Sequence, residues 1–232
     1  MREKISEVVL AVETIATTPP PAGVREREFL LSWSHGDDER QESALRMRLA
    51  PLTARLAAVA LLNPRTGGGR VWYEHPGGAP GATPDGRIAL IPGTEATLLT
   101  GFWRAVAPFR RIITFNGRFF VCPFLMLRSA LLGIPPARNL LPYRFSPSEH
   151  CDLLDQLTFY GATRRFSLEA YCRGFGIPPP GGEAGRPEIS SLAATGRYRE
   201  IAELALETCS AVAELYSLWA RLLSSPGGAE RT

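Results

Sequence analysis

Residues 110–125 read R-R-I-I-T-F-N-G-R-F-F-V-C-P-F-L, and this stretch decides the fold. A short apolar run at 112–115 stops at Asn116-Gly117, and an apolar, helix-like segment then runs from Phe119 to about Leu132. This order predicts a buried strand, a tight turn and a helix. Such a turn lies at the carboxyl end of a sheet, where α/β proteins build their sites. Val121 and Cys122 follow the turn, where a chemically active residue would be expected, and neither of them is acidic.

The chain before this stretch predicts strands. The segment 6–15 predicts a strand, because residues 8–12 form a continuous apolar run, as in a central strand, and Glu13 and Thr14 follow at the end of the run. Residues 52–62 fit strand or helix by periodicity, and the glycine turn at 67–69 leads into a strand at 71–73, which together predict a hairpin. Residues 87–91 predict a third hairpin strand, so that three antiparallel strands open the chain.

The chain after this stretch predicts mainly helices. Thr94 is a good N-cap for the helix that Pro108 ends, and Gly133 ends the helix that follows the turn. The remaining predictions are a short strand or turn entering a helix at 150–155, a short helix capped by Ser167, a long helix at 197–223 and a flexible tail at 224–232.

The order of these elements predicts the fold class. It favours an α/β, ribonuclease H-like mixed β-sheet, with three antiparallel strands followed by parallel strands and with helices on both faces. Residues 1–223 are expected to form one domain of this type.

Composition indicates a soluble globular protein of the cytoplasm. The 232 residues are 45% hydrophobic and 21% charged, and no apolar run approaches the ~20 residues of a membrane span. The net charge of +3 permits nucleic-acid binding without arguing for it. The four cysteines are far apart and form no C-x-x-C motif, which predicts free buried thiols and neither a zinc site nor disulfides.

Four stretches carry a family resemblance that covers most of the chain. They are the strand that ends in Glu13-Thr14, the segment from Thr94 to the T-F-N-G-R turn at 114–118, the H-x-D-L-x-D stretch at 150–155 with Tyr160-Gly161-Ala162, and the end from Gly196 to Tyr216. In combination they resemble the predicted 3′–5′ exonucleases related to the proofreading domain of family B DNA polymerases.

That superfamily carries four acidic residues, and the resemblance locates their positions here. The first motif resembles F-D-I-E-T but reads L-A-V-E-T, so Ala11 replaces the aspartate while Glu13 keeps the glutamate. The second resembles N-G-R-x-F-D-L-P, with Val121 at the aspartate. The third places Leu204 at a tyrosine and Thr208 at the last aspartate. Three carboxylates and the tyrosine are therefore missing.

These losses bear on the chemistry that the resemblance implies. Such nucleases use two Mg²⁺ or Mn²⁺ ions ~4 Å apart, held by several hard oxygen ligands. Glu13 alone cannot neutralise two dications. The expected protein therefore has an exonuclease-like domain without metal-dependent nuclease activity or a metal cofactor, and it serves as a nucleic-acid-binding or scaffold subunit.

Two alternatives remain open at this point. One is an active exonuclease that holds Mg²⁺ or Mn²⁺ with shifted acids, namely Glu13, Asp152 and Glu207. The other is a protein–protein scaffold that does not contact nucleic acid. The expected partners are a single-stranded nucleic acid and a protein such as an active nuclease or polymerase, with no membrane contact.

A few further residues have candidate roles. Asn116 and Arg118 are candidates for contacting a phosphate, and the alternative is a tight turn with a solvated arginine. Glu13 is either a remnant of a ligand site or is paired with an arginine such as Arg118. His150 is expected to be a hydrogen-bonded structural residue. One of the neighbouring residues Trp72 and Tyr73 is expected to face outward, where it is free to stack on a base.

Overall fold

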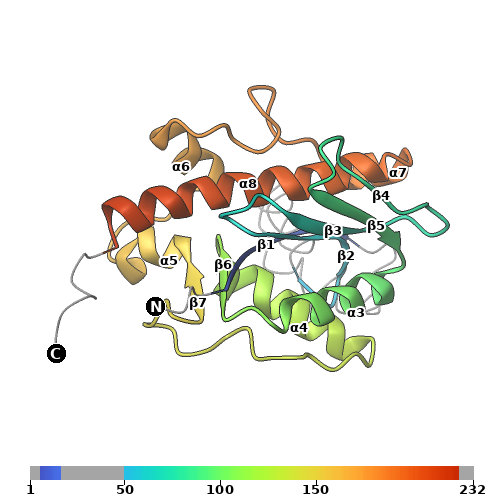
Figure 1. Cartoon of the computed structure of the whole chain (residues 1–232), viewed down its shortest axis with the longest axis horizontal. Coiled ribbons are helices and arrows are strands. Elements are labelled where there is room, and N and C mark those ends of the chain that lie inside the picture. The colour runs from blue at the N-terminus through green and yellow to red at the C-terminus, as the bar shows by residue number, and fades with distance from the viewer. Residues whose placement is uncertain (1–5, 17–49, 225–232) are drawn as a thin grey trace, which may run out of the picture.

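In residues 6–16 and 50–224, which the computed structural model describes, the chain forms a seven-stranded mixed sheet with helices on both faces (Figure 1). The strand order is β4-β5-β3-β2-β1-β6-β7. This arrangement confirms the predicted α/β, ribonuclease H-like mixed sheet flanked by helices.

The elements have the following bounds. The strands are β1 Glu7–Ala16, β2 Ala54–Leu62, β3 Gly69–Glu74, β4 Gly81–Ala82, β5 Ile88–Gly93, β6 Arg111–Thr114 and β7 His150–Asp152. The α-helices are α3 Glu95–Val106, α4 Cys122–Leu131, α5 Leu153–Leu157, α6 Leu168–Phe175, α7 Ile189–Ala194 and α8 Tyr198–Leu222. A π-helical turn at Gly117–Val121 and a 3₁₀ turn at Phe159–Gly161 complete them.

The sheet has an antiparallel half and a parallel half. β1 pairs antiparallel with β2, and β2 pairs antiparallel with β3. On the other side of β1, β6 pairs parallel with β1 and β7 pairs parallel with β6. The prediction that residues 87–91 form a third, antiparallel hairpin strand was wrong. β5 runs parallel to β3, because the loop after β3 contains its own return strand, β4, which pairs antiparallel with β5.

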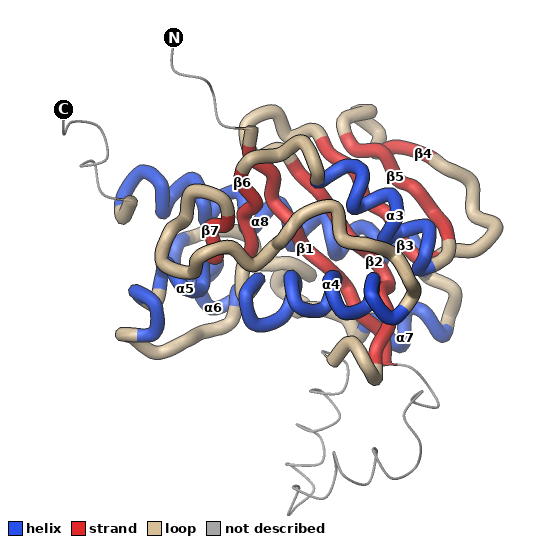
Figure 2. The backbone as a smooth tube through the Cα atoms, turned by 90° about the horizontal axis from the view of Figure 1, so that it is seen from below, coloured by secondary structure: helices blue, strands red, loops and turns tan. Residues whose placement is uncertain are grey.

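Helices cover both faces of the sheet. α8 lies along one face, and α3 and α4 lie on the other (Figures 1 and 2). Since side chains alternate along a strand, Val9 and Ala11 of β1 join the core under α8, while Val8 and Leu10 join the core under α3 and α4.

Because helices cover both faces of the sheet, the two neighbouring aromatic residues of β3 are both buried. Trp72 and Tyr73 point to opposite faces, and they are only 4% and 6% exposed. The expectation that one of them faces outward was therefore wrong, because both faces of β3 are covered at these two positions.

The turn between β6 and α4 follows from its sequence. Asn116 adopts the left-handed conformation with φ 56°, which asparagine tolerates better than most residues. A Cβ atom on Gly117 would lie 2.0 Å from Thr114 Oγ1 and 2.9 Å from His150 Nε2, so only glycine fits. Thr114 Oγ1 and His150 Nε2 are hydrogen-bonded at 2.8 Å. This bond confirms the expectation that His150 is hydrogen-bonded, and burial lowers its pKa to about 3, which keeps the ring neutral.

Several other predictions can be compared with the structure. Thr94 and Ser167 cap α3 and α6 as expected, and the four cysteines are free and buried. The predicted tail, apart from Ser224, lies outside the described residues. Within the described ranges, no helix combines the length and the apolar character needed to cross a bilayer.

Candidate functional site

A cavity of about 650 Å³ lies at the end of β1, on the side of the sheet that α8 covers. Its walls come from β1, the 115–121 stretch, the start of α6, residues 186–190 and α8. The four positions at which the resemblance expects carboxylates all line this cavity: Ala11, Glu13, Val121 and Thr208. Residues almost 200 positions apart in the sequence thus meet at one place.

Local structure explains how β1 contributes to the cavity. Ala11 and Glu13 are two residues apart on β1, so their side chains point to the same face of the sheet. The pairing with β2 is irregular at this point: Glu13 pairs with Ala58, whereas Thr14 pairs with Leu56. Such a bulge bends the strand and redirects its side chains, and bulges recur beside functional sites.

Glu13 is bound by an arginine inside the cavity. The Glu13 side chain is only 3% exposed, and its Oε1 accepts a hydrogen bond from Arg186 Nη2. Arg186 Nη1 also lies 3.4 Å from Thr208 Oγ1, to which it donates, so one guanidinium bridges two of the four motif positions. The predicted pairing of Glu13 with an arginine is found, but the partner is Arg186 and not Arg118.

The electrostatics of Glu13 reflect this setting. Burial raises its pKa above the ordinary value for a glutamate, and the nearby charge of Glu169 acts in the same direction. The charge and hydrogen bond of Arg186 oppose the shift. An arginine thus balances the one carboxylate among the four motif positions.

The other three motif positions offer little to a metal ion. Ala11 and Val121 are buried and have no ligand atoms. The Thr208 hydroxyl donates to the Leu204 carbonyl at 2.9 Å, one turn earlier in α8, as well as accepting from Arg186. Magnesium and manganese need several hard, charged oxygens, so these residues do not fit a pair of divalent cations.

The structure does not bring the shifted acids together. Asp152 caps α5 by accepting from Leu154 N at 3.1 Å, and it also accepts from Arg118 N at 2.8 Å. Burial raises its pKa to about 6. Glu207 is exposed and accepts from Gly181 N at 2.9 Å. Neither residue lines the cavity, and the described residues contain no group of three or more histidine, cysteine or acidic side chains placed to hold a metal.

The two candidate phosphate contacts lie in different surroundings. Asn116 lines the cavity. Arg118 does not, because its guanidinium donates to the carbonyls of Pro142 at 2.9 Å and Tyr143 at 3.1 Å and lies 3.8 Å from Asp155. Its side chain is mostly buried, so it holds the 142–143 loop in place and is not a solvated arginine of the turn.

Sequence reasoning missed several residues of the cavity. Arg186 is 173 positions from Glu13, and its sequence context, Gly185-Arg186-Pro187, has no motif that announces an ion pair. Phe115 and Phe120 also line the cavity. Their position beside Asn116 was the available signal, because the predicted turn already placed that segment at the edge of the sheet.

Comparisons with known proteins agree with this geometry. Residues 87–230 match the model of a family described as a predicted 3′–5′ exonuclease related to the exonuclease domain of PolB. No curated protein matches the chain. A solved structure of the family B DNA polymerase from the hyperthermophilic archaeon Pyrobaculum calidifontis matches with a TM-score of 0.57 and 13% identity, over 93% of this chain and 25% of the polymerase chain. At that identity the likeness shows the fold alone, and this chain spans about a quarter of the polymerase.

Proposed function

The chain belongs to the family of predicted 3′–5′ exonucleases related to the exonuclease domain of PolB, and from this premise we propose that it has lost the metal-dependent nuclease reaction and serves as a nucleic-acid-binding subunit. The observation that carries the proposal is the content of the cavity. All four motif positions line it, and a guanidinium binds the only carboxylate among them.

The proposed loss of activity follows from charge balance. Phosphodiester cleavage by two metal ions requires several negative side chains close together. Here Arg186 brings a positive charge to Glu13, so a cation approaching this carboxylate meets repulsion from the guanidinium. Ala11 and Val121 add no compensating charge. Glu169 and Glu188 also line the cavity, but neither occupies a motif position, so the four motif positions do not supply the charge that two metal ions need.

The cavity keeps groups suited to a nucleic-acid end. Phe115 and Phe120 contribute aromatic rings to its wall, and rings are the common stacking surface for unpaired bases. A protein partner with nuclease or polymerase activity would supply the missing chemistry.

A cleavage assay tests the loss of activity. We expect the purified protein to leave 5′-labelled single-stranded DNA and RNA intact in Mg²⁺ or Mn²⁺, and Glu13→Ala to behave identically. Shortening of the strand from its 3′ end in Mn²⁺, abolished by Glu13→Ala, would refute the proposal.

A metal titration tests the reason for the loss. In calorimetry we expect no Mn²⁺ binding at millimolar concentration by the natural protein. A variant with Ala11→Asp, Val121→Asp, Thr208→Asp and Arg186→Gln restores the carboxylates and should bind Mn²⁺. The matched control carries asparagine at the same three positions with Arg186→Gln, and it should not bind. Equal binding by the natural protein and the aspartate variant would show that the existing residues suffice.

A further inference from the structure

Large aromatic side chains are exposed beside the cavity, and arginines lie between them. Phe119, Tyr143, Phe145 and Phe166 are each more than half exposed. Arg144 and Arg165 contact these rings. We call these six residues the aromatic–arginine band. Isolated exposed apolar residues are normal on a protein surface, but a contiguous group of this kind marks an interaction site.

Ring and cation contacts join five of the six residues, and the sixth, Phe166, follows Arg165 in the chain. The Arg165 guanidinium lies 4.1 Å from the centre of the Phe119 ring. The Arg144 guanidinium lies 5.3 Å from the same ring and 5.9 Å from that of Phe145. Phe145 in turn contacts Tyr143, with ring centres 5.8 Å apart. These distances lie within the range of cation–π and aromatic pairing, so the rings are held in place before any ligand binds.

The band reaches the cavity through one further ring. Phe166 contacts Tyr171 with ring centres 6.1 Å apart, and Tyr171 contacts Phe115 at 5.9 Å. Phe115 lines the cavity, as does Ser167, the residue after Phe166. A single nucleic-acid strand that leaves the cavity would thus meet aromatic rings at the rim of the cavity.

The charge of the band is positive at its surface. Asp155 is buried beneath it and accepts hydrogen bonds from Arg144 at 2.7 and 3.0 Å. Arg118 and Arg165 lie 3.8 and 3.9 Å from the same carboxylate. Three guanidinium groups thus surround the Asp155 carboxylate, and the buried Asp152 carboxyl also acts on Arg144. Both charged residues of the band itself are arginines.

We propose that the aromatic–arginine band is a docking surface for single-stranded DNA, on which bases stack against the rings and phosphates pair with Arg144 and Arg165. This combination of ring faces and cations is the usual means of binding a single strand. A protein partner would not require the positive surplus. Duplex DNA hides its bases, so the exposed rings favour an unpaired strand.

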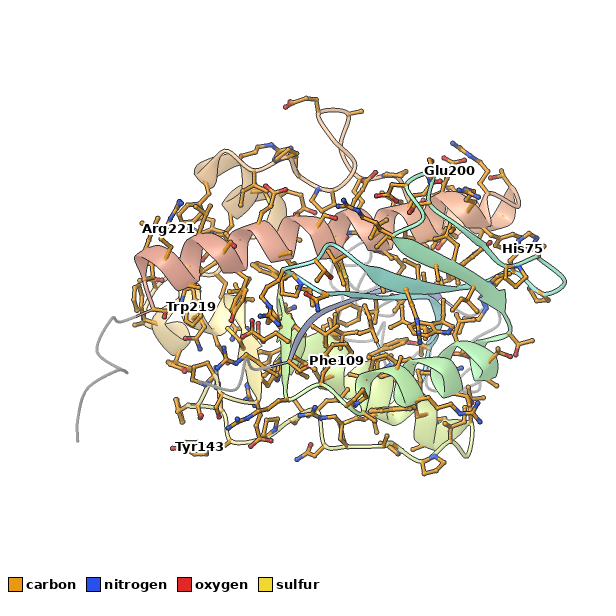
Figure 3. The ribbon with its side chains drawn as sticks, viewed as in Figure 1. His75, Phe109, Tyr143, Glu200, Trp219 and Arg221 are labelled. Atoms are coloured by element: carbon orange, nitrogen blue, oxygen red, sulfur yellow. The ribbon has the colours of Figure 1, made fainter. Side chains whose placement is uncertain are left out.

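The position of the band allows matched controls. In Figure 3, Tyr143 lies at the end of the molecule that also carries Trp219, whereas Glu200 lies at the opposite end. Arg199, the residue before Glu200, is an exposed arginine paired with Glu203 and serves as the control for Arg165. Leu131, exposed at the end of α4, serves as the control for ring removal.

Fluorescence anisotropy with a short labelled oligonucleotide tests the proposal, with EDTA present so that cleavage cannot interfere. Tyr143→Ala and Phe145→Ala should each weaken binding by about fivefold to a hundredfold, as expected for loss of one stacked base. Arg165→Gln should weaken binding and make the dependence of log affinity on log salt shallower by about 0.7. Leu131→Ala and Arg199→Gln should bind as the natural protein does.

Four results would overturn the proposal. They are no binding of the single strand, unchanged binding in the Tyr143 and Phe145 variants, tighter binding of duplex DNA, and tighter binding of RNA of the same sequence. A change in oligomeric state in the Phe145 variant, with DNA binding unchanged, would assign the surface to a protein contact instead. The proposal rests on the nucleic-acid-binding role proposed above: no binding at all would overturn both, whereas unchanged binding in the band variants would overturn this one alone. None of these results depends on metal or on cleavage.

Discussion

The ion pair between Glu13 and Arg186 joins a buried group to a partly exposed one. Glu13 is 3% exposed and Arg186 is 29% exposed. Removing the arginine leaves a buried carboxylate without its counter-charge, whereas removing the carboxylate leaves a guanidinium that can reach water. The two single substitutions should therefore have unequal effects.

We expect Arg186→Met to lower the free energy of unfolding by about 1–3 kcal/mol, below the usual value for breaking a fully buried pair because Arg186 partly meets solvent. Glu13→Gln should cost less. Urea denaturation of both single variants and the double variant measures the coupling between them. Additive effects in this cycle would contradict a specific pairing of the two side chains.

Asp152 gives the protein a pH dependence of stability with a definite sign. Its pKa is raised from 3.8 to about 6 by burial, so between these values the folded state holds a proton that the unfolded state has released. The contribution of Asp152 to the free energy of unfolding is thus fully present below about pH 4 and is lost as the pH rises through 6. His150 acts in the opposite direction, because its pKa is lowered to about 3.

The contribution of Asp152 can be isolated by difference. We expect the free energy of unfolding of the natural protein, minus that of Asp152→Asn, to fall by on the order of 2 kcal/mol between pH 4 and pH 6. Since His150 is present in both proteins, its effect cancels. Urea denaturation at several pH values measures the difference, and a flat difference curve would contradict the assignment.

At the scale of elements, the turn between β6 and α4 depends on close packing. Gly117 lies against Thr114 and His150, which are hydrogen-bonded to each other. The turn joins β6 to α4, and Val121, its last residue, lines the cavity. Its geometry thus fixes the position of one of the four motif residues.

A matched pair of glycine substitutions tests this dependence. We expect Gly117→Ala to destabilise the protein by more than about 2 kcal/mol, because the new methyl group collides with Thr114 and His150. Gly174→Ala, in α6 with nothing within 4 Å of the added atom, should be stabilising by about 0.5–1 kcal/mol. Thermal denaturation compares the two, and similar melting temperatures would show that the turn can relax.

The elements that the sequence predicted well are those with local signals. Thr94, Ser167 and the Asn116-Gly117 turn each show the residue types that their backbone positions require. Residues 52–62 were ambiguous because β2 is buried on both faces, which removes the alternation that identifies a strand. The parallel pairing of β5 has no local signal, since it depends on where a distant loop returns the chain.

At the scale of the whole molecule, the residues of the site also divide into those with a signal in the sequence and those without one. The motif positions Ala11, Glu13, Val121 and Thr208 were identified in the sequence, and the structure brings them to one cavity. Arg186 was not identified, because a contact across 173 residues follows only from the complete fold. The aromatic–arginine band had a signal that was overlooked, the alternation in Tyr143-Arg144-Phe145 and Arg165-Phe166.

The reactivity of the four buried cysteines can be used to measure whether the molecule unfolds as one unit. Cys122 belongs to the core under α3 and α4, and the other three belong to the core under α8. Burial raises the pKa of each thiol, that of Cys172 to about 11. Both burial and the scarcity of thiolate protect them from reagents.

We therefore expect none of the four thiols to react readily with a disulfide reagent in native buffer, and all of them to react together at the rate of unfolding in denaturant. Ser217→Cys, at an exposed position of α8, should react at once and serves as the control. One natural thiol reacting far faster than the other three would show that its part of the molecule opens alone.

The position of α8 in the chain order bears on how the protein is made. α8 follows every strand of the described sheet, yet it supplies the cover for Val9, Ala60 and Val71. During synthesis at about 5–20 residues per second, the strands leave the ribosome on the order of ten seconds before α8 does. Through that interval one face of the nascent sheet is bare and apolar, so this protein should depend on a ribosome-associated chaperone more strongly than one whose covering helix is made first.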